Sequence, residues 1–169
     1  IFKARQNIFH ACSEDVDLIY HYSQNKALEN VFDTQIAMSF LGHGLQVSYQ
    51  NALKQVLDID IEKDQTRSDW LARPLTPEQM NYAANDVLYI MKLAEKVKIE
   101  LQQKSLYECA IEDCNSLTHE IATETPFELL YLDVGNYRHS RRQLMQLQQV
   151  AIWREQMVKA LNLPRSFIL

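Results

Sequence analysis

Glycine is scarce in this sequence, with only three among 169 residues, at Gly42, Gly44 and Gly135. A loop that holds the phosphates of a nucleoside triphosphate needs several clustered glycines, because its backbone N–H groups must approach the phosphates closely. The sequence has no such cluster. Nucleoside-triphosphate chemistry is therefore unsupported.

Cysteine and long apolar runs are also scarce. The three cysteines, Cys12, Cys109 and Cys114, are an odd number without zinc-binding spacing, so we expect reduced thiols in a cytoplasmic protein. No run of about 18 apolar residues occurs, and no signal peptide is recognisable. With 47% hydrophobic and 23% charged residues, the composition is typical of a globular domain without a membrane span.

Charge is unevenly distributed along the chain, whose net charge is −5 at pH 7. Residues 134–169 carry six arginines and lysines against one acid, so the acidic excess lies before them. An acidic body with a basic end can combine metal ligands with a surface for a polyanion, or it can be only a solvated face. Charge alone favours the solvated face.

Two short strands, each followed directly by a helix, are predicted near the start of the chain. Ser13 is expected to cap the first helix, and Asp33 or Thr34 the second. This order is typical of an α/β domain, whose first strands we expect to precede Ile1. The predicted strands are NIFHAC (7–12) and NVFDT (30–34), and the predicted helices are SEDVDLIYHYSQ (13–24) and QIAMSFLG (35–42).

Helices dominate the rest of the predicted structure. The stretch Thr76-Pro77-Glu78-Gln79 is typical of a helix start, with a capping threonine, a first-position proline and a capping-box glutamine. That helix is predicted to run unbroken from Pro77 to about Lys104. Further helices are predicted over 48–58, over 107–123, from 127 onward and from Ser140 to the end. The change of charge near Gly135 suggests two domains, 1–135 and 136–169.

Asp86 and Tyr82 are the first candidates for chemistry. They are four residues apart in a predicted helix and therefore lie on one side of it. Most helical aspartates simply face water, and a buried one is costly unless a partner compensates its charge. A functional interpretation of Asp86 therefore requires further carboxylates and a cation.

Asp15 is the best partner, because it lies in the first turn of a helix that directly follows a strand. Such a place holds a ligand rigidly, and carboxylate oxygens are what magnesium and manganese prefer. Two such ions, about 3.5–4 Å apart, can clamp a phosphodiester. The alternative for Asp15 is stabilisation of the helix dipole, which Glu14 and Asp17 would provide equally well.

Three stretches, HACSEDVDLI, VFDTQIA and RSDWLARPLTPEQMNYAANDVLYI, resemble bacterial ribonuclease D, of the tyrosine-containing subgroup of DEDD-type 3′-5′ exonucleases. The resemblance implies a ribonuclease H-like 3′-5′ exonuclease core. It also implies two divalent ions, Mg²⁺ or Mn²⁺, four acidic ligands in three motifs, and a tyrosine. Asp15 matches the second motif, and Tyr82 and Asp86 match the third. All three are expected to be catalytic, and Asp15 and Asp86 to bind metal.

The first motif of that family, an Asp-x-Glu on an early strand, is absent before Asp15. The only Asp-x-Glu, Asp60-Ile61-Glu62, follows Asp15 in a charged connection and is interpreted as a solvated loop. Two of the four ligands are therefore expected outside this chain, and the chain alone is expected to be inactive. The fold class is α/β, with a core lacking its first strands and hence mostly helical.

The end of the chain, LMQLQQVAIWREQMVKALNLPRSFIL, resembles the opening of an HRDC domain, an all-α nucleic-acid-binding module. The resemblance to ribonuclease D implies an exoribonuclease that trims the 3′ ends of RNA precursors such as tRNA. We expect it to act as a cytoplasmic monomer. Alternatives are a DNA-directed 3′-5′ exonuclease of the same fold and a non-catalytic nucleic-acid-binding domain. His10 and Arg73 are candidate substrate-binding residues, although a hydrogen-bonded histidine at a strand end fits His10 equally well.

Overall fold

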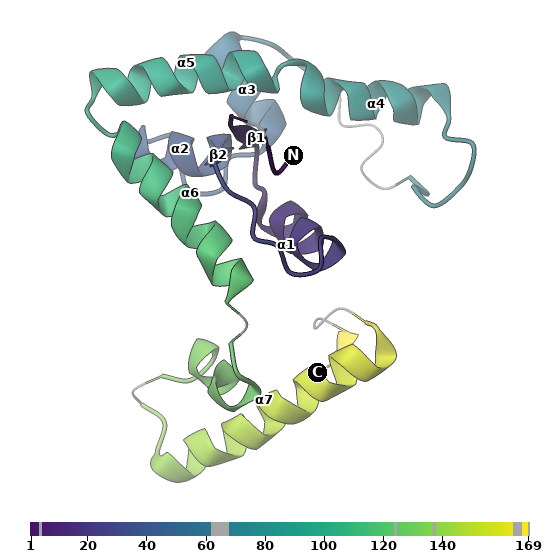
Figure 1. The fold of residues 1–169 in the computed structure, drawn as a ribbon, viewed down its shortest axis with the longest axis vertical. Coiled ribbons are helices and arrows are strands. Elements are labelled where there is room, and N and C mark those ends of the chain that lie inside the picture. Colours follow the sequence, from purple (N-terminus) through teal and green to yellow (C-terminus); the bar gives the residue numbers. More distant parts are fainter. Residues whose placement is uncertain (4, 62–67, 124, 137, 164–166, 169) are drawn as a thin grey trace. The chain divides into compact units, whose positions relative to one another are not determined.

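The chain folds into two compact units, residues 1–122 and 123–169, each described here by itself (Figure 1). None of the helices in the described part of the chain is both long and apolar enough to cross a membrane. The computed structural model describes residues 1–3, 5–61, 68–123, 125–136, 138–163 and 167–168.

A two-stranded parallel sheet lies at the start of the first unit. Strand β1 (Asn7–Phe9) pairs with β2 (Val31–Asp33), and Phe9 stands opposite Asp33 at the carboxyl ends of the strands. Helix α1 (Ser13–Tyr22) connects them, as parallel pairing requires a crossover. The predicted strands are confirmed, although both are shorter than the apolar stretches suggested.

The start of α1 differs from the prediction, because Ser13 is its first helical residue and not its cap. Cys12 occupies the N-cap position and makes no side-chain capping hydrogen bond. The expected serine cap was wrong because the preceding turn is held from the neighbouring strand by Asp33, which accepts a hydrogen bond from the Cys12 backbone N–H at 2.7 Å.

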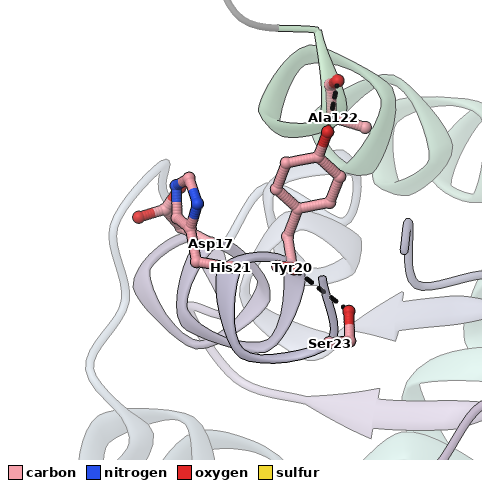
Figure 2. A network of polar contacts seen from close by, with 5 residues as sticks. All are labelled: Asp17, Tyr20, His21, Ser23 and Ala122. Atoms are coloured by element: carbon pink, nitrogen blue, oxygen red, sulfur yellow. Dashed lines mark hydrogen bonds and ion pairs between the residues drawn. The ribbon is translucent and has the colours of Figure 1, made fainter. Parts of the chain in front are cut away.

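The far end of α1 is tied to helix α6 (Tyr107–Ala122). The Tyr20 hydroxyl donates a hydrogen bond to the Ala122 carbonyl oxygen at 3.1 Å, and Figure 2 shows the ring spanning from one helix to the other. Ser23 donates from its hydroxyl to the Tyr20 carbonyl at 3.0 Å, which closes the last turn. Helix α1 is therefore anchored at both ends by different contacts.

Two short capped helices follow the sheet. Asp33 caps α2 (Thr34–Phe40) by accepting from two backbone N–H groups, as predicted. Ser48 caps α3 (Tyr49–Leu57), which ends in a left-handed residue. Asp60, in the connection after α3, forms an exposed ion pair with Lys54 at 2.8 Å, in agreement with a solvated loop, while Glu62 lies outside the described residues.

The predicted long helix is broken into two. Helix α4 (Pro77–Leu88) ends and α5 (Ile90–Gln103) begins at Tyr89, which has φ −106° and ψ −8°. The predicted unbroken helix was wrong, and no proline or glycine near Tyr89 signals the break, so local propensity alone predicts a continuous helix. Of these two helices α5 buries four apolar residues and α4 buries only Gln79.

The core of the first unit is centred on α5. This helix packs against β1, α2 and α3, while α6 packs against α1, α2 and β2. All three cysteines are free thiols, as expected from their number and spacing. The largest fully buried apolar side chains of this core are those of Phe32, Met38, Leu53, Leu93 and Leu101.

The second unit pairs a 3₁₀ helix, η1 (Phe127–Asp133), with α7 (Arg141–Leu161). Ser140 and Gln143 form a capping box at the start of α7, and Gln148 donates to the Glu128 carbonyl at 2.7 Å. The predicted domain boundary between residues 135 and 136 lies inside this unit and stays a prediction.

Candidate active site

One pocket of about 520 Å³ in the first unit brings most of the sequence candidates together. It lies beside the carboxyl end of β1, the first turn of α1 and the second half of α4. Arg73 is not among the residues that line it. Its lining residues are Ile8, Phe9, His10, Asp15, Tyr49, Gln50, Tyr82, Asp86, Val87 and Ile90.

Asp15 and Asp86 supply the two carboxylates of this pocket. Burial raises the pKa of each above its ordinary value, and at Asp15 the charges of Glu14 and Asp33 raise the pKa further. Partly desolvated carboxylates of like charge are stabilised by a nearby cation, and their hard oxygens suit Mg²⁺ or Mn²⁺. The two residues therefore fit a divalent metal as donors.

The donor set is small. Within the part of the chain that the structure describes, no group of three or more histidine, cysteine, aspartate or glutamate residues is placed to hold a metal ion. Divalent hard cations take about six oxygen ligands, so two carboxylates fill only part of a coordination shell.

Tyr82 lies one turn before Asp86, and Trp70 packs against it. The ring centroids are 5.8 Å apart and the planes are inclined by 54°. Gln79 fixes the segment that carries Trp70, since its side-chain amide donates to the Asp69 carbonyl at 2.9 Å and to the Ser68 hydroxyl at 3.2 Å. The segment before α4 thus supports the Tyr82 side of the pocket.

Arg73 is exposed and bonded to its own loop. Its Nη1 donates to the carbonyl oxygens of Trp70 at 2.9 Å and Ala72 at 2.8 Å. These bonds stabilise the loop before α4. A contact between Arg73 and a substrate phosphate stays a prediction.

His10 lines the pocket with both ring nitrogens engaged. Nε2 lies 2.8 Å from the Val47 carbonyl oxygen, and Nδ1 lies 2.8 Å from the Thr34 hydroxyl. A carbonyl oxygen only accepts, so Nε2 carries a proton, and burial lowers the pKa of the ring. The hydrogen-bonded histidine at a strand end is confirmed, and a role toward substrate stays a prediction.

Similarity to known proteins decides the family of this chain. The model of a 3′-5′ exonuclease family matches residues 2–102. The chain belongs to this 3′-5′ exonuclease family. Members of the family generally use divalent metal ions, in agreement with the carboxylate chemistry of the pocket.

Curated relatives of this chain are bacterial ribonucleases D, so the resemblance inferred from the motifs is confirmed. The ribonuclease D of Pseudomonas paraeruginosa is 35% identical over 163 residues, covering 96% of this chain and 43% of the relative. That of a Shewanella species is 32% identical, covering 96% and 42%. The chain thus spans less than half the length of these relatives.

Solved structures give the same result for the fold. Escherichia coli RNase D, described as an exoribonuclease involved in structured RNA processing, superposes with a TM-score of 0.79 at 28% identity, over 95% of this chain and 43% of that one. Brucella melitensis NrnC superposes with a TM-score of 0.66 at 26% identity, over 82% and 67%. The predicted fold class, a mostly helical part of an α/β exonuclease core, is confirmed.

The sequence indicated only part of the role of Asp33, namely its capping of the helix that follows it. Its side chain is 1% exposed and accepts four backbone hydrogen bonds. The bonds to Gln35 and Ile36 are the predicted helix cap. The bonds from Ala11 and Cys12 reach Asp33 from the turn that follows the neighbouring strand β1, and no local sequence signal could reveal them.

Tyr49 also lines the pocket, and the sequence analysis did not identify it. Its ring lies 5.5 Å from that of His10. Burial raises the pKa of its hydroxyl to about 12, the charge of Asp86 adds to the rise, and the backbone of Tyr89 opposes it. In the sequence Tyr49 is only the first residue of a capped helix, and nothing there connects it with Asp86.

Proposed function

We propose that the complete protein containing this chain is a metal-dependent 3′-5′ exoribonuclease, which trims the 3′ ends of RNA precursors such as tRNA precursors. The observation that carries the proposal is the meeting of Asp15, Tyr82 and Asp86 in one pocket, although α1 and α4 are far apart in sequence. A non-catalytic domain would have no reason to keep this arrangement.

Each of the three residues has a distinct task in this proposal. Asp15 and Asp86 bind divalent metal through their carboxylate oxygens, and Tyr82 orients the attacking water at the scissile phosphate. Bound metal would supply the activation of water and the support of the leaving oxygen. His10 and Tyr49 form the wall beside the carboxylates, and Arg73 is proposed to reach a substrate phosphate once its loop bonds open.

RNA is the proposed substrate because the chain is similar to ribonucleases D along almost its whole length. Residues 136–169 are proposed as the start of an HRDC domain that binds nucleic acid. The exposed arginines Arg138, Arg141 and Arg142 suit contact with an RNA backbone. We further propose a monomer acting in the cytoplasm, where free thiols persist.

Hydrolysis assays test this function. We expect the complete protein with Mn²⁺ to shorten a 5′-labelled single-stranded RNA one nucleotide at a time from its 3′ end. Residues 1–169 alone should show little hydrolysis, because their described donors fill only part of a coordination shell. Robust hydrolysis by residues 1–169 would contradict the incomplete site, and a complete protein that cleaves only DNA would replace RNA with DNA as the substrate.

A further inference from the structure

We propose that Asp33 is a positioning residue for the metal-binding carboxylate of Asp15. The inference rests on the proposed function, because it concerns the same metal site. The buried carboxylate of Asp33 holds the starts of two helices, α1 and α2, and α1 carries Asp15.

The place of Asp33 in the sheet makes this possible. It is the last residue of β2 and stands opposite Phe9, the last residue of β1. The chain leaves both parallel strands at the same edge of the sheet, so a side chain at the end of β2 can reach the turn that follows β1. The residue is 1% exposed, and water cannot replace the bonds it makes.

The carboxylate of Asp33 bonds to both helix starts, and Oδ1 serves both of them. Oδ1 accepts from the Gln35 N–H at 2.7 Å, which caps α2, and from the Ala11 N–H at 3.1 Å in the β1–α1 turn. Oδ2 accepts from the Cys12 N–H at 2.7 Å. Charged acceptors make the stronger class of hydrogen bond, so these contacts are well suited to hold backbone in place.

The β1–α1 turn needs this support from outside. Ala11 has φ +60°, a left-handed conformation that a residue with a Cβ rarely adopts. Cys12, the N-cap of α1, makes no side-chain capping bond of its own. Asp33 therefore takes the place of the missing cap, from a strand twenty-one residues further along the chain.

The β1–α1 turn determines the position of Asp15. The Cys12 carbonyl accepts from the Val16 N–H at 2.8 Å, which closes the first turn of α1 around Asp15. Fixing the Cys12 backbone thus fixes the direction in which Asp15 leaves the helix. If α1 started in a different orientation, the Asp15 carboxylate would point away from the pocket and would no longer share a metal ion with Asp86.

Two substitutions separate the tasks of Asp33. In Asp33→Ser the short hydroxyl still caps α2 but cannot span to the β1–α1 turn. In Asp33→Asn the oxygen can keep the Oδ1 bonds, while an NH₂ group faces the Cys12 N–H, donor against donor. The matched control is Tyr20→Phe, which removes the bond from α1 to Ala122 at the other end of the same helix (Figure 2).

The experiment measures Mn²⁺ affinity of the complete protein, from the electron paramagnetic resonance signal of free Mn²⁺, together with the thermal unfolding midpoint. We expect the dissociation constant to rise about tenfold or more in both Asp33 variants, as loss of a supporting partner usually causes. Raising Mn²⁺ should restore RNA hydrolysis in both. Tyr20→Phe should lower the unfolding midpoint and leave Mn²⁺ affinity unchanged.

Folded Asp33 variants that bind Mn²⁺ as the unsubstituted protein does would overturn the inference while leaving the proposed function intact. So would failure of both variants to fold, because Asp33 would then serve stability alone. A complete protein that neither binds Mn²⁺ nor hydrolyses RNA before any substitution would refute the proposed function itself, and the inference with it.

Discussion

The ring of Trp70 packs on the ring of Tyr82, with centroids 5.8 Å apart, and so joins the segment before α4 to the proposed water-orienting residue. Tyr82 lies on a helix whose only buried residue is Gln79, so the core constrains it little. The aromatic contact supplies a constraint that the core does not.

Replacing Trp70 with alanine should therefore lower kcat more than it changes KM. Aromatic pairs contribute about 0.5–1.5 kcal/mol, so we expect a loss of about two- to tenfold in kcat for RNA hydrolysis by the complete protein. The control is Trp153→Ala, in the second unit, which should keep kcat. An unchanged kcat in Trp70→Ala would show that Tyr82 is held by other contacts.

Asp15→Asn should abolish most hydrolysis, because an amide is a poor ligand for a divalent cation. We expect kcat to fall by more than about a hundredfold, beyond the loss typical of outer-shell partners. Asp17→Asn is the matched control on the same helix, since Asp17 is exposed and pairs with His21 at 3.4 Å. Equal losses in the two variants would point to the charge of the helix start and not to ligation.

His10 should make stability depend on pH. Burial lowers its pKa below the ordinary value of 6.5, while the Val47 carbonyl and the charge of Asp33 oppose that shift. The unfolded chain then takes up the proton first, so the contribution of His10 is fully present above about pH 6.5 and decreases as pH falls toward the lowered pKa.

Urea unfolding of residues 1–169 at pH 7.5 and 5.5 measures this effect. The free energy of unfolding should fall more steeply on acidification in the unsubstituted chain than in His10→Gln, which retains a donor for Val47 but does not titrate. Each unit of pKa shift corresponds to about 1.4 kcal/mol. Identical pH dependence in the two proteins would contradict the burial argument.

Gln79 should matter more than the equivalent glutamine of the second capping box. Its Oε1 accepts from the Thr76 N–H at 2.9 Å, and its amide also holds the Trp70 segment. Gln79→Ala removes these two part-buried hydrogen bonds, and we expect a cost of about 1–3 kcal/mol in the free energy of unfolding, measured in urea. Gln143→Ala, exposed in α7, should cost less than about 1 kcal/mol.

Gln79→Glu refines this comparison. The carboxylate keeps the acceptor for Thr76 but cannot donate to the Asp69 carbonyl, so it should be destabilised nearly as much as Gln79→Ala. A fully stable Gln79→Glu would mean that the capping box, and not the link to the Trp70 segment, explains the burial of Gln79.

Local signals explain what could be predicted. The cap at Thr76 was readable because a capping box lies within four consecutive residues. Ser140 was predicted only as the start of the last helix, and the structure shows that it is the N-cap of that helix. The i, i+4 relation of Tyr82 and Asp86 and the strand–helix position of Asp15 also needed only short stretches. Their meeting in one pocket was expected from the resemblance to ribonuclease D, since spacing alone does not place α1 beside α4.

Remote contacts explain what could not be predicted. The start of α1 is capped by Asp33, which lies at the end of strand β2, so the prediction of Ser13 as the N-cap was wrong. No proline or glycine marks the break at Tyr89, and α5, which follows it, packs against the distant helices α2 and α3. Tyr49 lies in the pocket because α3 lies near α4 and β1 in the folded chain, and its place in the sequence does not indicate this.

The break at Tyr89 also separates two levels of local stability. Helix α5 is held by Leu93, Ala94, Val97 and Leu101 and can exchange its amide hydrogens only when the core unfolds, whereas α4 has no apolar residue buried to this degree. We therefore expect the helix that carries Asp86 to open and reclose while the core stays folded.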